Sequence, residues 1–209
     1  MPFTLRGVLC HLRSGAGVEN PDRTCYDRET GRFAKRGGSG LRLFIAIPLD
    51  GALRAAVQSV QDDFRRCGVR GNYTKAENLH LTLAFIGEHP DADGVLEVLD
   101  AVPFAPFELR LEGIGAFGDL WWLGIQRSAA LEVYVRRLRR ALAAAGIPFD
   151  RKRFSPHITL VRRADRDGRD MPGFAVPEAG MRVEHIALMR SDRGRDGMIY
   201  TEIESGRRV

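Results

Sequence analysis

The hydrophobic pattern along the chain becomes regular from Leu41 onward. Residues 41–49 (LRLFIAIPL) predict a strand that Pro48 ends. Apolar residues at helical spacing follow, and they predict a helix over 51–68 with Asp50 as its cap and a glycine at its end. The next apolar stretch, 78–87 (NLHLTLAFIG), predicts a second strand, and a short helix is expected around 91–102.

The same order of elements recurs further along the chain. Residues 107–117 and 120–126 predict a hairpin across Gly118-Asp119, and a second long helix over 130–146 again ends in glycine. Further strands are predicted at 157–163, 181–191 and 198–205. The repeated order of strand, long helix and strand predicts an internal duplication of α+β character, in which helices pack on sheets.

One strand in each copy opens with a histidine and a threonine. Side chains alternate along a strand, so His80 and Thr82 share one face, with their Cα atoms about 6.6 Å apart. The same spacing relates His157 and Thr159. If the two strands are neighbours in the sheet, two imidazoles and two hydroxyls line one groove.

Such a set of side chains suits acid–base chemistry on a phosphate ester. An imidazole titrates near pH 6.5, so one histidine can take a proton from water while the other gives a proton to a leaving oxygen. Threonine hydroxyls can donate hydrogen bonds to phosphoryl oxygens. The sequence lacks the carboxylate clusters of a two-metal phosphoesterase, so we expect no metal and no other cofactor.

A packing role is the main alternative for these residues. A single His-x-Thr on a half-buried strand is more often a packing feature than a site. Two copies in matching positions of a repeated unit favour function. Of the other histidines, His89 is predicted to lie in a loop, His185 to be a structural strand residue, and His11 to belong to the N-terminal segment.

Composition narrows the class of protein. The chain has 209 residues and 23.3 kDa, and its 44% hydrophobic and 28% charged residues are typical of a soluble globular protein. No apolar run approaches the roughly 18 residues of a membrane helix, and the N-terminus lacks a signal-peptide core. We therefore expect no membrane contact and a cytoplasmic location. The three cysteines, Cys10, Cys25 and Cys67, do not suggest a disulfide framework.

Residues 1–40 differ from the rest of the chain. They hold seven Lys/Arg against four Asp/Glu, a net charge of +3 out of +5, and they end in the sequence KRGGSG. Without sustained periodicity, they predict a flexible N-terminal extension. Cys10, His11 and Cys25 lack a fourth ligand at a zinc-finger spacing. An alternative hypothesis is that translation begins near Leu41.

Cations also cluster in the remainder of the chain. RNA is the polyanionic partner that such clusters suit, although a solvated helix face and its flanks give the same pattern. The clusters comprise Arg136, Arg137, Arg139, Arg140, Arg151, Lys152, Arg153, Arg162 and Arg163.

The chain resembles the two-histidine phosphoesterase superfamily and, within it, the RNA 2′,3′-cyclic phosphodiesterases, also called 2′-5′ RNA ligases. The likeness covers residues 41–204. It rests on the segments LRLFIAIPL, ENLHLTLAFIGE, LEGIGAFG with LWWLGI, FSPHITLVR and LMRSDRGRDGMIYTEI. The paired motifs are typical of the superfamily, and the flanking segments indicate its cyclic phosphodiesterase branch.

This resemblance implies a bilobal fold over residues 41–209, with two antiparallel-rich sheets, helices outside and a pseudo-two-fold, metal-free groove between the lobes. It implies that a monomer hydrolyses 2′,3′-cyclic phosphate ends of RNA, such as tRNA fragments, or cyclic nucleotides, to 2′-phosphates, with 2′-5′ ligation as the reverse reaction. His80 and His157 become the acid–base pair, with His80 as the acid in one of two nearly symmetric assignments. Thr82 and Thr159 become the phosphate-binding hydroxyls.

The resemblance also extends to residues around the second motif. Arg162 matches a basic position, and Phe154 precedes the motif at the usual spacing. A solvated strand-end cation and plain core packing are the alternatives. Family members show tryptophan and proline before the first motif, where this chain offers Tyr73. The hairpin loop GAFGDLWWL is short, which predicts fewer substrate contacts from it.

Two other functions stay open at the level of sequence. A related phosphodiesterase could keep the fold and act on a small nucleotide, such as ADP-ribose cyclic phosphate or 2′-5′ oligoadenylate. A non-catalytic RNA-end binding module would show salt-sensitive RNA binding that survives loss of the histidines.

Overall fold

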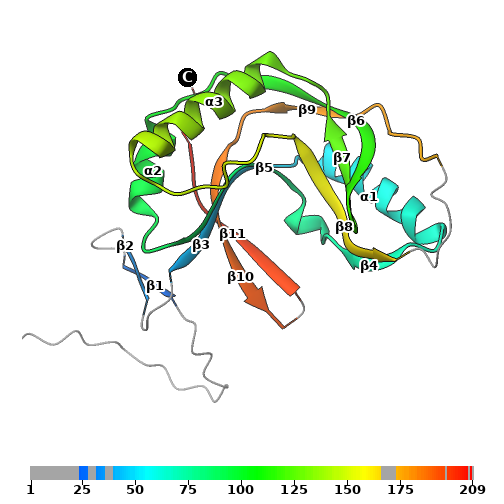
Figure 1. Cartoon of the computed structure of the whole chain (residues 1–209), viewed down its shortest axis with the longest axis horizontal. Helices are drawn as coiled ribbons and strands as arrows, with labels where there is room; N and C mark the ends of the chain where they lie inside the picture. Colours follow the sequence, from blue (N-terminus) through cyan, green and yellow to red (C-terminus); the bar gives the residue numbers. More distant parts are fainter. Residues whose placement is uncertain are drawn as a thin grey trace, which may run out of the picture. The chain divides into compact units, whose positions relative to one another are not determined.

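The computed structural model describes residues 24–27, 32–35, 40–165, 173–195, 197–206 and 208 (Figure 1). Contacts divide the chain into two units, residues 1–38 and 39–209. In the first unit, β1 (Thr24–Asp27) pairs with β2 (Arg32–Lys35) in antiparallel fashion, a pairing that the sequence did not predict. The rest of the expected extension, including Cys10 and His11, lies outside the described residues.

The described part of the second unit is built from nine strands, three α-helices and one 3-10 turn. The strands form one sheet in the order β11-β10-β3-β5-β8-β7-β6-β9, with β4 beside β8, and every strand pairing is antiparallel. In chain order the elements are β3 (Leu41–Pro48), α1 (Gly51–Arg66), β4 (Arg70–Tyr73), η1 (Ala76–Asn78), β5 (His80–His89), α2 (Asp93–Asp100), β6 (Phe107–Phe117), β7 (Leu120–Ile125), α3 (Ala129–Ala144), β8 (His157–Asp165), β9 (Gly180–Val183), β10 (Ala187–Gly194) and β11 (Gly197–Ser205).

The predicted α+β class and antiparallel character are confirmed, but the two expected sheets are joined into one. The junction is narrow, because β5 and β8 pair through the single position Leu81–Ile158. Both side chains are fully buried. Each such aliphatic side chain stabilises the fold by roughly 1.5–3 kcal/mol. Packing beneath the junction therefore keeps the two sets of strands in one sheet.

Helix α1 forms where the sequence predicts it. The Asp50 side chain accepts a hydrogen bond from the Leu53 amide at 2.7 Å, and Gly68 follows the helix with φ 80°. Its apolar stripe is buried, and the amide of the buried Gln61 donates to the backbone carbonyls of Thr74 and Leu160, both at 2.9 Å. The helix thereby ties the segment after β4 to β8.

The helices cover different strands of the sheet. α1 follows β3 in the sequence but contacts β8 and β9, whereas α3 follows β7 but contacts β5 and α2. Figure 1 shows α2 and α3 together at one end of the sheet and α1 beside β4 and β8 at the other. Among the described residues, none of the helices is both long and apolar enough to cross a membrane.

One predicted strand is wrong, and one observed strand was not predicted. The single strand expected over 181–191 is broken at 184–186, because β9 pairs with β6 at one edge of the sheet while β10 pairs with β3 near the other. His185 lies in this break, and its Nε2 bonds to the Glu202 carboxylate at 2.9 Å. β4 was not predicted, since its sequence RGNY carries no alternating apolar pattern.

Candidate active site

The two His-x-Thr motifs meet at the narrow junction of the sheet. Because β5 and β8 are antiparallel and pair at Leu81–Ile158, continuing this register by one position brings His80 opposite Thr159 and Thr82 opposite His157. All four side chains lie on the face away from the buried Leu81 and Ile158, and all four are half-buried. The predicted neighbourhood of the two motifs is thus present.

Both imidazoles are held in the same way. The Nδ1 atom of His80 lies 2.7 Å from the backbone oxygen of Asn78, and that of His157 lies 2.7 Å from the backbone oxygen of Ser155. A carbonyl oxygen only accepts, so Nδ1 carries the proton and donates. In the neutral tautomer Nε2 is then unprotonated and free to accept a proton. For His80 this atom lies 3.0 Å from Thr82 Oγ1, which donates to it.

The surroundings of His80 favour its neutral form. Burial lowers its pKa to about 4, and the positive charges of Arg162 and His157 act in the same direction. Its hydrogen bond to Asn78 opposes the shift without overcoming it. The ring also packs against Phe44, at 4.9 Å between centroids, and against the edge of Tyr200 at 5.2 Å.

His157 lies among aromatic side chains from the β6–β7 hairpin. Its ring centroid is 5.3 Å from that of Phe117 and 6.0 Å from that of Trp122. Phe117 stands at the hairpin tip and is 50% exposed. The Trp122 ring lies across Gly115, where a Cβ atom would come within 2.3 Å of it. The short hairpin therefore still brings an exposed aromatic ring to the site.

Of the other residues that the sequence suggested for the site, Arg162 lies near His80, whereas Phe154 and Tyr73 are engaged in packing contacts. Arg162 is exposed on β8 and close enough to His80 to influence its charge. Phe154 packs against the hydrophobic core, and the Arg139 guanidinium carbon lies over its ring, 5.5 Å from the ring centroid. These contacts favour a packing role for Phe154 over base stacking. Tyr73 donates to the Val69 carbonyl at 2.8 Å and lies under Arg65, so its ring is engaged by α1 and its neighbours.

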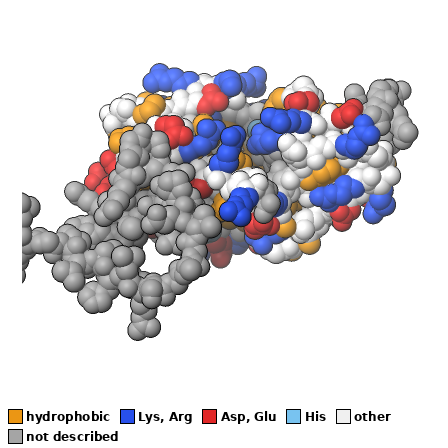
Figure 2. Space-filling model, turned by 90° about the horizontal axis from the view of Figure 1, so that it is seen from below, with side chains coloured by type: hydrophobic (Ala, Val, Ile, Leu, Met, Phe, Trp, Pro, Cys, Tyr) orange, Lys and Arg blue, Asp and Glu red, His pale blue; other side chains and the backbone are white. Residues whose placement is uncertain are grey.

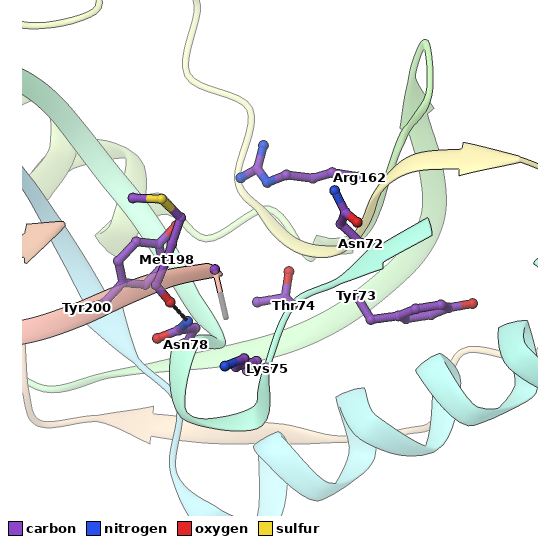
Figure 3. Close-up of a pocket in the computed structure, with 9 residues that line it drawn as sticks. Asn72, Tyr73, Thr74, Lys75, Asn78, Arg162, Met198 and Tyr200 are labelled. Atoms are coloured by element: carbon purple, nitrogen blue, oxygen red, sulfur yellow. Dashed lines mark hydrogen bonds between the residues drawn. The ribbon is translucent and has the colours of Figure 1, made fainter. Parts of the chain in front are cut away.

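A pocket of about 460 Å³ has in its lining Asn78 and Tyr200, both of which contact His80 (Figure 3). It lies between β4 with its following segment, β8, and the start of β11. Asn78 connects His80 to the β11 wall of the pocket. Its backbone oxygen accepts from His80, and its side-chain amide donates to the Met198 carbonyl at 2.7 Å. The described residues that line the pocket are Asn72, Tyr73, Thr74, Lys75, Asn78, Arg162, Gly197, Met198 and Tyr200.

Cations are spread widely over the surface. Figure 2 shows Lys and Arg side chains across the viewed face, with Asp and Glu among them. Not every predicted cation is available to a partner, since Arg139 donates to the Lys152 carbonyl at 2.8 Å and lies above Phe154. Among the described residues, no three His, Cys, Asp or Glu side chains are arranged to hold a metal ion.

Sequence reasoning missed the residues that surround the histidines. Asn78 stands two positions before His80, as Ser155 does before His157, and this common offset was the available signal. Tyr200 and Lys75 come from segments whose approach depends on the fold of the sheet. No local pattern indicates that approach.

Comparisons with known proteins identify relatives of this chain. The chain is 29% identical over 181 residues to an RNA 2′,3′-cyclic phosphodiesterase of Methanothermobacter thermautotrophicus, covering 78% of this chain and 97% of that one. It is 32% identical over 155 residues to one of Geobacillus stearothermophilus, covering 65% of this chain but only about half (49%) of that longer protein. The crystal structure of E. coli LigT complexed with 3′-AMP superposes with a TM-score of 0.65 at 28% identity, over 80% of this chain and 97% of LigT.

A family model gives the same assignment. The model of the 2′-5′ RNA ligase superfamily matches residues 49–195, which include both His-x-Thr motifs and the β6–β7 hairpin. With most of the described sheet inside this match, the chain belongs to the 2′-5′ RNA ligase superfamily.

Proposed function

We propose that the protein hydrolyses 2′,3′-cyclic phosphate ends of RNA to 2′-phosphates without a metal ion, with His80 and His157 as the acid–base pair. The observation that carries this proposal is the meeting of two imidazoles, each anchored through Nδ1, on one face at the Leu81–Ile158 junction. Relatives named RNA 2′,3′-cyclic phosphodiesterase support the reaction.

The chemistry requires two proton transfers on opposite sides of the phosphorus. One imidazole takes a proton from water as the water oxygen attacks the phosphorus in line, and the P–O3′ bond breaks. The other imidazole gives its proton to the departing O3′, so the products are a 2′-phosphate and a 3′-hydroxyl. We assign the hydroxyls of Thr82 and Thr159 to hold the charged phosphoryl oxygens, for which Thr82 exchanges its hydrogen bond to His80 Nε2 for one to the phosphate.

The environment of His80 favours the base role for it, opposite to the sequence-based assignment. With a pKa of about 4, His80 is neutral at pH 7 and its Nε2 can accept a proton. We therefore assign His80 as the base and His157 as the acid.

We further propose that residues 41–209 form the catalytic domain, with residues 1–40 as an extension, and that this domain has two pseudo-symmetric lobes. Matched registers support the symmetry. In one half His80 pairs with Pro48 and Thr82 with Ala46; in the other, His157 pairs with Gly124 and Thr159 with Trp122. Since one chain supplies both histidines, a monomer suffices. The exposed, unpaired thiol of Cys67 is compatible with a reducing cytoplasm.

The direct test is hydrolysis of an RNA oligonucleotide with a 2′,3′-cyclic phosphate end in the presence of EDTA. The wild-type protein should yield the 2′-phosphate. His80→Ala and His157→Ala should each lower kcat by about 10²- to 10⁴-fold, as expected for loss of one acid–base group. His89→Ala, which removes a histidine at the far end of β5 from His80, should retain activity.

Each alternative has its own outcome in this assay. Wild-type rates in both motif variants would refute the acid–base pair. RNA binding that survives both substitutions, without product from any variant, would indicate a binding module instead. Turnover of ADP-ribose cyclic phosphate or 2′-5′ oligoadenylate in preference to RNA ends would reassign the substrate while keeping the mechanism.

A further inference from the structure

The two sides of the histidine pair differ in chemical character. Beside His157 lie the aromatic rings of Phe117 and Trp122. On the other side, the 460 Å³ pocket has Tyr200 in its wall, and the rings of Tyr200 and His80 are in T-shaped contact with centroids 5.2 Å apart. This volume lies within the roughly 300–1,000 Å³ of small-molecule sites. The pocket is therefore large enough for a chemical group additional to the reacting phosphate.

The pocket is suited to an anion. Its described lining residues include two cations, Lys75 and Arg162, and no carboxylate. Neither cation forms an ion pair with a carboxylate of the described residues. Figure 3 shows Arg162 and Lys75 on opposite sides of the pocket, with the Thr74 hydroxyl between them. Unpaired cations with neutral donors nearby are the usual partners of phosphate oxygens.

The walls of the pocket are also tied to the reacting centre. Asn78 joins His80 to Met198 through its backbone oxygen and its side-chain amide, a link that Figure 3 marks with a dashed line on the Met198 side. Arg162 is near enough to His80 to affect its protonation. An anion in the pocket would thus contact residues that also interact with His80.

We propose that this pocket binds a second phosphate of the substrate, the one on the 5′ oxygen of the terminal nucleoside. This inference rests on the proposed hydrolysis of cyclic phosphate ends. In RNA, the 5′ phosphate joins the terminal nucleotide to the preceding one and is the nearest other anion along the strand. The aromatic rings beside His157 carry no charge to attract this phosphate, whereas the pocket offers it the cations Lys75 and Arg162. The pocket thereby distinguishes RNA ends from nucleosides that carry only a cyclic phosphate.

The test compares two substrates that differ in this phosphate alone. They are adenosine 2′,3′-cyclic phosphate and its 5′-phosphorylated form, assayed with EDTA at low salt. The wild-type protein should prefer the 5′-phosphorylated form by about fivefold in kcat/KM, as for a few charge-assisted contacts at a solvent-facing site. Lys75→Gln should reduce this ratio to about twofold or less. The ratio cancels any general effect of the substitution on the fold or on the histidines.

A matched variant and a salt series complete the experiment. Arg127→Gln also removes one exposed cation, which pairs with Glu132 outside the pocket, and it should leave the preference unchanged. For the 5′-phosphorylated substrate, the slope of log kcat/KM against log salt should become less negative in Lys75→Gln, because salt screens the charge contact that this variant lacks. Equal kcat/KM for the two substrates, or a preference that Lys75→Gln leaves intact, would overturn the second-phosphate site alone. No turnover of either substrate would refute the hydrolysis itself and this site with it.

Discussion

Lowering the pH from 7 to 5 should destabilise the folded protein by about 2 kcal/mol through His80 alone. Burial holds the pKa of this imidazole at about 4 in the folded chain, against 6.5 in an exposed one. Between these values the unfolded chain binds a proton that the folded chain excludes, so stability falls as the pH drops. At pH 7 both states are mostly neutral at this residue. At pH 5 only the unfolded state is protonated, and 1.5 pKa units at 1.36 kcal/mol each give the figure of about 2 kcal/mol.

Urea denaturation at pH 7, 6 and 5 measures this effect when wild type is compared with His80→Gln. Gln cannot titrate, so the variant should lose about 2 kcal/mol less than wild type over this range, whatever its stability at pH 7. His89→Gln, at the opposite end of β5 from His80, controls for loss of a histidine outside the motifs. The His80 ring proton resonances, followed by NMR, should titrate near pH 4. Equal slopes for wild type and His80→Gln, or a titration midpoint near 6.5, would refute the claim that burial keeps His80 neutral.

Three further predictions concern the site and its supports. If His80 is the base, kcat/KM plotted against pH should fall on the acidic side with a midpoint near pH 4. A midpoint above pH 6 would make His157 the base instead. Gly115→Ala places a Cβ atom against the Trp122 ring, so it should cost about 1–3 kcal/mol and change tryptophan fluorescence; wild-type stability and emission would contradict this packing. Gln61→Leu removes the donor to two backbone carbonyls and should cost about 1–3 kcal/mol in urea denaturation, whereas Gln58→Leu on the exposed face of α1 should change stability by less than about 0.5 kcal/mol.

The sequence predicted the elements whose signals are local and strong. Asp50 and Gly68 mark the two ends of α1 because a capping side chain and a left-handed glycine act within one helical turn. The two motifs fixed the shared face of each His-Thr pair because strand geometry alone sets the alternation. The antiparallel pairing of β5 and β8 makes the two motif strands neighbours in the sheet, which is the condition that the shared groove required.

The parts that could not be predicted depend on distant segments. β4 is a short polar strand that exists because β8 offers its backbone as a partner at Asn72 and Tyr73. The break at 184–186 follows from the separate edges to which β9 and β10 belong. The low pKa of His80 depends on burial near Phe44 and Tyr200, which lie far away in the sequence. Local patterns carry no information on such contacts.

Helix α1 packs on strands made later in the chain, and α3 packs on the earlier strand β5. This arrangement has a consequence for synthesis of the chain. When His80 leaves the ribosome, the strand β10 that borders β3 and the helix α3 that contacts β5 have not yet been made. Helix α1, already complete, must wait for β8 and β9 before its apolar stripe is covered. Pairings between such distant segments form slowly. A nascent chain that carries only His80 therefore lacks partners of its own strand, and the proposed acid–base pair can form only after β8 has been made.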